Sequence, residues 1–356
     1  MLAVLTKKDR TVLLLAIVAT IGAFVTTKIQ AGEIIPFVAA AAALSLLAMI
    51  VGEATDHLGS KLGPGATGVL QSALGNLPEL FVCIFALRAG LVEVVKGALI
   101  GSILANSMLV LGVAMLAGGI KNGTQRFGKG SPRMMSTLML LASAALVVPT
   151  LISTLHTPAE KHVQSYSTAV AIVLLIVFGC SLPFFLKRDP ELSVTRPPED
   201  THHAWPLGLS VGLLALSGVG AAFVSEWFVS ALEPATKAMG ISQAFSGLVV
   251  VAIAGNAIEN FVGIQLAVAN KMDYALSVIL NSSLQIALAL IPILVLLSMV
   301  IGGAALNLVF SPLLVVALIL SSLLSAFIVY DGESLWIEGV ALIGLYAVIV
   351  SAFWWG

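Results

Sequence analysis

The stretch Gly75-Asn76-Leu77-Pro78-Glu79-Leu80 lies inside an apolar run that extends from about residue 66 to residue 87. An acidic side chain at the centre of a membrane helix costs roughly 2.5–3.5 kcal/mol on insertion scales, so such residues are rare unless they are functional. The chain carries this cost twice, because Gly255-Asn256-Ala257-Ile258-Glu259-Asn260 lies in a second apolar run, from about 244 to 269. Glu79 and Glu259 occupy the same position in their stretches. The two stretches predict one paired polar site around which the rest of the chain forms a scaffold.

The composition of the 356-residue chain is that of a polytopic membrane protein. Hydrophobic residues make up 59% of the chain and charged residues 10%, which is more apolar surface than a soluble domain can bury. The net charge of −1 gives no electrostatic basis for binding nucleic acid. The two cysteines, Cys83 and Cys180, both lie in apolar runs and predict neither a disulfide framework nor a thiolate metal site.

Eleven apolar runs are long enough to cross a bilayer, at about 20 residues each. They are 11–27, 34–52, 66–88, 93–117, 134–153, 165–186, 205–229, 243–268, 273–300, 306–329 and 334–355. The sequence therefore predicts an all-α polytopic membrane protein with about eleven transmembrane helices. The short connections Arg88-Ala89-Gly90 and Asn270-Lys271-Met272 predict two pairs of antiparallel neighbouring helices.

The distribution of Lys and Arg predicts the orientation. If the N-terminus is cytoplasmic, the inner segments hold twelve of these residues and the outer segments hold five. The outer five are Lys28, Arg88, Lys96, Lys161 and Lys237. Because cytoplasmic loops carry the excess of positive charge, the N-terminus is predicted to be cytoplasmic and the C-terminus to lie on the outer or lumenal side. In a prokaryote the membrane would be the cell membrane.

Polar identities recur when the second stretch is aligned on the first. Gly75 aligns with Gly255, Asn76 with Asn256 and Glu79 with Glu259, and the same alignment pairs Ser102 with Ser282. Five spans per unit is an odd number, so the two units should cross the membrane in opposite directions, as the inverted repeats of secondary transporters do. The predicted organisation is an N-terminal transmembrane helix (1–32), a first five-helix repeat (33–186), a cytoplasmic linker (187–204) and a second five-helix repeat (205–356).

The chemistry of the two motifs points to a hard cation. Gly75 and Pro78 predict a helix break beside Glu79, and Gly255 predicts a break in the second motif. Freed carbonyls, amides and a carboxylate suit Ca²⁺ better than Zn²⁺ or Cu⁺. A divalent cation neutralises the two facing glutamates, whereas in its absence burial and mutual repulsion favour their protonated forms. Competition of cation and protons for one site predicts their exchange.

The helices after the motifs add further polar side chains to otherwise apolar runs. Ser102 and Asn106 follow the first motif, and Asn281, Ser282, Ser283 and Gln285 follow the second. Ser102, Ser282 and Gln285 are predicted to line the site, with hydrogen bonding between helices as the alternative role. Asn281 and Ser283 are consistent with either role.

At these residues the sequence resembles the Ca²⁺/H⁺ (CAX) antiporter branch of the cation/Ca²⁺ exchanger superfamily. The family patterns Gly-Asn-x-x-Glu-Leu and Gly-Ser-Ile-Leu-x-Asn match residues 75–80 and 101–106. In the second repeat, Asn260 and Asn281 stand where the family has His and Gly. The resemblance implies alternating access, with Glu79 and Glu259 as the ligands of Ca²⁺ and protons. The supporting residues that it implies are Asn76, Asn256, Ser102, Ser282 and Gln285.

Other functions stay open at this point. Exchange of Na⁺ or K⁺ for Ca²⁺, or of a monovalent cation for H⁺, would use the same superfamily fold. An intramembrane enzyme or a channel is a remote alternative, because all five histidines lie in loops or at span ends. No Gly-x-x-x-x-Gly-Lys loop for ATP is present, so a gradient should drive transport. We expect Ca²⁺ and protons as transported substrates, a lipid bilayer as surroundings, no nucleic acid partner, no resident cofactor and no enzymatic activity. A homo-oligomer is compatible with the sequence.

Overall fold

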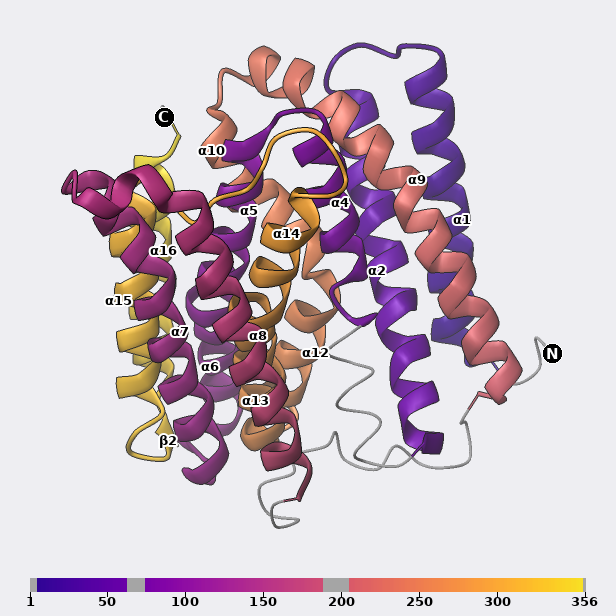
Figure 1. Ribbon diagram of the computed structural model, residues 1–356. Coiled ribbons are helices and arrows are strands. Elements are labelled where there is room, and N and C mark those ends of the chain that lie inside the picture. The colour runs from indigo at the N-terminus through magenta and orange to yellow at the C-terminus, as the bar shows by residue number, and fades with distance from the viewer. Residues whose placement is uncertain (1–4, 63–73, 188–204, 355–356) are drawn as a thin grey trace.

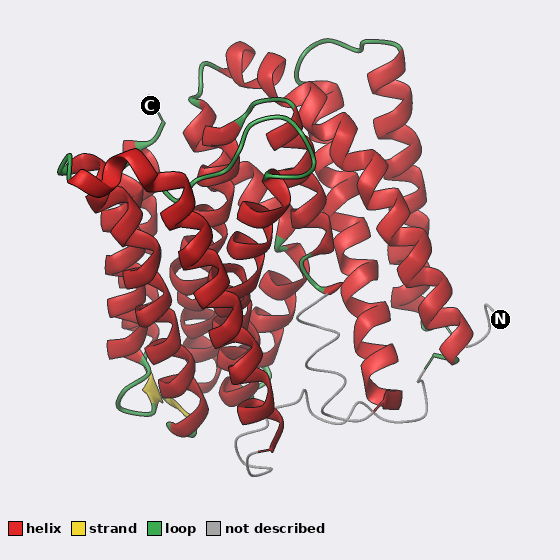
Figure 2. Ribbon diagram, viewed as in Figure 1, coloured by secondary structure: helices red, strands yellow, loops and turns green. Residues whose placement is uncertain are grey.

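The structure, a computed structural model, describes residues 5–62, 74–187 and 205–354, and almost all of them are helical (Figure 1, Figure 2). Within these ranges the side chains of Asp56, 59–62, 184–187 and 257–259 are not described. The first half contains α1 (Lys7–Lys28), α2 (Ile35–Leu62), α4 (Leu77–Arg88), α5 (Val92–Leu104), the π-helical segment η2 (Ala105–Val110), α6 (Leu111–Asn122), β1 (Gln125–Arg126), α7 (Gly130–Thr154), the 3₁₀ turn η3 (Pro158–His162) and α8 (Val163–Lys187). The second half contains α9 (Leu207–Met239), α10 (Gln243–Phe245), the π-helical segment η5 (Ser246–Val251), α11 (Ala252–Gly255), α12 (Ala257–Val268), α13 (Met272–Gln285), the π-helical segment η6 (Ile286–Leu290), α14 (Ile291–Ser298), α15 (Pro312–Ile328), β2 (Glu333–Ser334) and α16 (Trp336–Ala352).

The helices have the length and composition of a multi-pass membrane protein. In the part of the chain that the structure describes, seven helices are long and apolar enough to cross a membrane. The pair Gln243–Gly255 and Asn260–Val268, bent by 62°, makes an eighth if it counts as one span. The helices α15 and α16 are apolar but have 17 residues each. The predicted run 66–88 extends into residues 63–73, which lie outside the described ranges.

The helices α1, α2 and α9 form one side of the bundle, with α2 packed against both others (Figure 1). Phe37 stacks on Phe228 with ring centroids 5.0 Å apart. At the end where α9 begins, the indole of Trp205 donates to Asp9 Oδ2 at 3.2 Å, and His57 stacks on the same indole at 4.4 Å. Aromatic contacts and this hydrogen bond thus connect the three helices.

The continuous helices formed by α5, η2 and α6 and by α13, η6 and α14 lie in the centre of the bundle and are its most buried spans. Glycine allows α5 to touch η5 backbone to backbone, because a Cβ on Gly101 would overlap Leu248 O. The helices α6 and α16 meet in the same way, since a Cβ on Gly339 would overlap Gly112 O. Side chains cannot fit at these positions, so the glycines set the helix separations.

Equivalent elements of the two halves begin at matching places in the aligned motifs. Thus α4 and α12 begin at Leu77 and Ala257, and α5 and α13 begin at Val92 and Met272. The turns between them contain Gly90, with φ 77°, and Asn270, with φ 59°. The π-helical segments η2 and η6 follow the same alignment to within one position. The predicted short connections after α4 and α12 are therefore confirmed.

Two connecting segments bind these turns, one at each end of the bundle. In the segment 303–310, Ala304 N donates to Leu87 O at the end of α4, at 3.2 Å. In the segment 122–128, Gln125 Nε2 donates to Ala267 O at the end of α12, at 2.8 Å. The first segment lies near the top of Figure 1 beside α14, and the second lies near β2 at the bottom. Each segment comes from one half of the chain and binds the turn of the other half.

Lys96, which the sequence analysis counts on the outer side, lies in the second turn of α5 and is only 7% exposed. Its ammonium group pairs with Glu93 Oε1 at 3.5 Å. The side chain buries its apolar stem against the bundle while its charge lies near the start of the helix, beside the exposed Glu93.

Candidate cation site

Both motifs are helix breaks, as the sequence predicted. Asn76 precedes α4 with φ −91° and ψ 15°, and Asn256 separates α11 from α12 with φ −101° and ψ 24°. Pro78 lies in the first turn of α4, where its missing N–H would have no helical partner, so proline favours the start of this helix. The second break has no proline and occurs at Asn256, directly after Gly255.

Each break places a helix N-terminus beside the motif. Unpaired N–H groups and the helix dipole give such an end partial positive charge, which stabilises a nearby anion. Glu79 is the third residue of α4, and Glu259 occupies the same position in α12. The glutamate is therefore next to the positive end of its own helix in both halves.

Glu79 is buried, with 1% of its surface exposed. Ser102 Oγ of α5 donates to Glu79 Oε1. Glu79 Oε2 is buried as well, and among the described residues it has no hydrogen-bond partner. Among the described residues, one oxygen of the carboxylate is thus held by Ser102 and the other has no donor.

The second motif lies against the first. A Cβ added to Gly255 would be 3.4 Å from Glu79 Cβ and 3.6 Å from Glu79 Cδ. Asn256, the next residue, donates from Nδ2 to Ser102 Oγ at 2.9 Å. The two breaks, far apart in sequence, therefore meet at one carboxylate.

A chain of neutral donors connects the halves. Asn106 Nδ2, in η2, donates to Asn256 Oδ1 at 3.2 Å and to Ser282 Oγ of α13 at 2.9 Å. Asn256 then donates to Ser102, which donates to Glu79. The donors of this chain point toward the carboxylate, and hydrogen bonds that are aligned in this way strengthen one another. The network stabilises negative charge at Glu79 without supplying a positive charge.

The remaining predicted residues lie around this network. Asn76 Nδ2 reaches Gln285 Oε1 at 3.5 Å, so these two amides also join the two halves. Ser283 is buried and donates to Ile279 O at 3.4 Å, so this hydrogen bond lies within α13 and does not connect two helices. The side chain of Glu259 lies outside what the structure describes, so its pairing with Glu79 stays a prediction.

Asn106 was not assigned to the site from the sequence, although the structure places it at the centre of the network. The sequence spacing could have assigned Asn106 to the site, because it follows Ser102 by one helical turn and both side chains lie on one face of the helix. The approach of Gly255 to Glu79 had no sequence signal, since it depends on how the halves pack.

The site suits a hard cation or a proton. Its polar atoms are carboxylate, amide and hydroxyl oxygens and amide N–H groups, and no Lys, Arg or His joins the network within the described ranges. Three or more His, Cys, Asp or Glu side chains do not converge anywhere in that part of the chain. A buried carboxylate without a partner charge is unfavourable, so it requires a bound cation or a proton.

Comparison with known proteins identifies the family. The family described as "Sodium/calcium exchanger protein" matches residues 33–187 and 209–355. A Ca²⁺/H⁺ antiporter of Aphanothece halophytica is 37% identical over 339 residues, 90% of each chain. A Ca²⁺/H⁺ antiporter of Synechocystis sp. is 36% identical over 340 residues, 90% of this chain and 91% of that protein.

Solved structures have the same fold. The structure of native YfkE has 28% sequence identity and a TM-score of 0.83, and the match covers 96% of this chain and 99% of that chain. The H⁺/Ca²⁺ exchanger CAX has a TM-score of 0.76 at 15% identity, with 98% of this chain and 92% of that chain covered, and shows the fold alone. The chain therefore belongs to the sodium/calcium exchanger family.

Proposed function

We propose that this protein is a secondary active antiporter that exchanges Ca²⁺ for H⁺ across a membrane by alternating access. The observation that carries the proposal is the buried Glu79 carboxylate, which has neutral donors on one oxygen and a second oxygen without a partner among the described residues. Either a cation or a proton can neutralise this carboxylate. Since both compete for one group, loading one releases the other.

The relatives support the substrates. Two proteins that match nine-tenths of this chain carry the name Ca²⁺/H⁺ antiporter. Their transport activity also supports a function other than enzymatic catalysis. In this proposal Ca²⁺ and protons are cargo, and the site oxygens replace the hydration shell of Ca²⁺ during transport.

We further propose eleven membrane spans, arranged as one extra N-terminal helix and two five-helix repeats of opposite orientation. The repeats would be 33–186 and 205–356, joined by the linker 187–204. Support comes from the constant spacing between equivalent helix starts and from the two turns, after α4 and after α12, that lie at opposite ends of the bundle (Figure 1). Glu259 would then complete the site from α12 as Glu79 does from α4.

The proposed orientation has the N-terminus in the cytoplasm and the C-terminus on the other side, in the cell membrane if the source is prokaryotic. It rests on the excess of Lys and Arg in the predicted inner segments. The described chain starts and finishes toward opposite ends of the bundle, which agrees with an odd number of spans (Figure 1).

The test is Ca²⁺ uptake into proteoliposomes driven by a proton gradient, for the native protein and for the variants Glu79→Gln and Glu259→Gln. We expect uptake that a protonophore abolishes and that both variants lose. Glu93→Gln is the matched control, because the Glu93 side chain is 59% exposed at the start of α5 and lies outside the network. Uptake that survives both site substitutions would refute the assignment.

The same vesicles test the alternative substrates. Uptake that follows an imposed Na⁺ or K⁺ gradient, with no response to the proton gradient, would transfer the proposal to Na⁺(K⁺)/Ca²⁺ exchange at the same site. Ca²⁺ flux without counterflow and without saturation would indicate a channel instead.

A further inference from the structure

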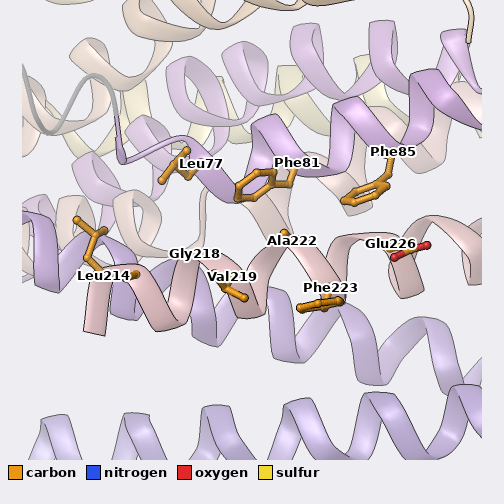
Figure 3. Close-up of a pocket in the computed structure, with 10 residues that line it drawn as sticks. Leu77, Phe81, Phe85, Leu214, Gly218, Val219, Ala222, Phe223 and Glu226 are labelled. Carbon is orange, nitrogen blue, oxygen red and sulfur yellow. The ribbon is translucent and has the colours of Figure 1, made fainter. Parts of the chain in front are cut away.

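A groove runs between α4 and α9 on the outside of the bundle, with a volume of about 400 Å³ (Figure 3). The residues that line it are Leu77, Phe81, Phe85, Leu214, Ala215, Gly218, Val219, Ala222, Phe223 and Glu226. All of them except Glu226 are apolar. In Figure 3, Leu77, Phe81 and Phe85 follow one another along α4, and Glu226 lies at the Phe85 end of this row.

Small residues create the groove. Ala215, Gly218 and Ala222 recur at three- and four-residue spacing on α9, so they form one stripe of that helix. A Cβ added to Gly218 would meet nothing within 4 Å, which shows that the space beside it is open. On another face of α9 a Cβ on Gly220 would contact Leu47 at 3.4 Å. The helix is therefore packed on its inner face and open on the face toward α4.

The groove opens to the hydrocarbon of the bilayer. The neighbouring side chains Leu216, Val219 and Phe223 are 73%, 58% and 56% exposed, and in a helix of a multi-pass membrane protein such side chains face lipid. Glu226 lies near the end of the predicted span 205–229, about 28 Å along α9 from Leu207 near the start of that span, at 1.5 Å per residue. The hydrocarbon layer is about 30 Å thick. Glu226 thus lies near the boundary of that layer, beside Trp227, a residue type that concentrates at such boundaries.

The carboxylates on α9 determine which lipid headgroup fits beside the groove. Glu226 is exposed, and among the described residues it takes part in no ion pair. The next carboxylate on α9, Glu233, is already paired with Lys237 at 2.7 Å. A free carboxylate at headgroup depth repels an anionic headgroup and can accept hydrogen bonds from a primary ammonium group.

We propose that this groove binds one acyl chain of an ethanolamine phospholipid, with its ammonium group on Glu226 and its chain running along α4 toward Leu77. Leu77 is the first residue of α4 and lies one turn or less from Glu79. The bound chain fills the space between α9 and the helix that carries Glu79, so it fixes the separation of these two helices. The lipid would accordingly be a structural ligand next to the cation site.

Photolabelling tests the binding. The full-length protein is reconstituted in vesicles that contain an ethanolamine phospholipid with a diazirine in its acyl chain, and labelled residues are mapped by mass spectrometry. We expect labels on Phe81, Phe85 and Phe223. Gly218→Leu fills the groove and should reduce these labels several-fold. Gly212→Leu is the matched control, because a Cβ on Gly212 also meets nothing within 4 Å and Gly212 does not line the groove.

The headgroup is tested separately. Unlabelled ethanolamine phospholipid should displace the label better than the glycerol phospholipid with the same chains. Glu226→Gln should remove that preference, whereas Glu233→Gln should retain it. Equal labelling of Gly218→Leu and native protein would overturn the proposal, as would protein–protein crosslinks at the groove, which would assign it to a second copy of the chain.

A Ca²⁺ uptake measurement, the transport arm of the experiment, connects the groove to the proposed function. Gly218→Leu should change the rate of Ca²⁺ uptake and make it independent of the ethanolamine content of the vesicles, while Gly212→Leu should retain the native dependence. This arm rests on the proposed exchange activity, but the labelling arm does not. A protein that labels as expected without Ca²⁺ uptake would refute the exchange and leave the lipid site intact.

Discussion

Replacing Ser102 with Ala removes the hydrogen bond that its hydroxyl group donates to the Glu79 carboxylate. A hydrogen bond to a charged group contributes about 1.5–3 kcal/mol, and each step of about 1.4 kcal/mol is a factor of ten in an equilibrium constant. Because Ser102 stabilises the charged carboxylate that a cation needs, its loss favours the protonated form. We therefore expect the apparent Km for Ca²⁺ to rise roughly 10- to 150-fold at fixed pH.

The assay is proton-driven Ca²⁺ uptake in proteoliposomes over a range of Ca²⁺ concentrations and pH. Raising the pH should partly restore Ca²⁺ affinity in Ser102→Ala, because it lowers the proton concentration that competes for Glu79. Ser107→Ala is the matched control, since Ser107 is equally buried and donates to Ile103 O of its own helix at 2.5 Å. Ser102→Thr, which keeps the hydroxyl group, should restore activity if the protein folds.

The reasoning fails if Ser102→Ala and Ser107→Ala have the same Km for Ca²⁺ and the same pH profile. Ser102 would then be a packing residue, and the hydrogen bond to Glu79 would have no effect on cation binding. A fall in maximal rate with unchanged Km would also contradict the argument, because the predicted change is in the binding of Ca²⁺ against protons.

Three further predictions concern stability, measured as the free energy of unfolding in mixed micelles. Gly101→Ala should destabilise the protein by about 1–3 kcal/mol, because its Cβ would overlap Leu248 O, whereas Gly179→Ala, in open space on α8, should be nearly neutral. Gly90→Ala should cost about 1–2 kcal/mol at φ 77°. Gln125→Ala should cost about 0.5–1.5 kcal/mol, because it removes one hydrogen bond to Ala267 O, which still accepts from Asn270 N and Asn122 Nδ2; equal stability of Gln125→Ala and native protein would show that this contact is dispensable.

The helix breaks could be predicted from the sequence because their cause is local. Glycine and proline within an apolar run disfavour a continuous helix wherever they occur, so Asn76 and Asn256 could be located without a fold. The turns after α4 and α12 were predictable for the same reason, since few residues separate two long apolar runs.

The contacts between the halves could not be predicted. Asn106 and Asn256 are far apart in the chain, and nothing in their spacing shows that one amide donates to the other. Which side chains meet depends on the close packing of α5 on η5. Glycines at 97, 101 and 247 allow this packing, but they do not determine which residues it brings together. The burial of Lys96 could not be predicted either, because the charge of a long side chain can lie several ångströms from its backbone.

The reciprocal binding of the two turns has a consequence for biosynthesis. Leu87 O accepts one hydrogen bond from Gly90 N within its own turn and a second from Ala304 N, and Ala304 is synthesised only after most of the second half of the chain. At about 5–20 residues per second, the ribosome needs on the order of tens of seconds to travel from one to the other. During this interval the turn at the end of α4 lacks its contact with Ala304, whereas residues 122–128, which bind Ala267, are already synthesised. The contacts at the two ends of the bundle therefore form in sequence. The contact near β1 can form first, and the contact near α14 forms last.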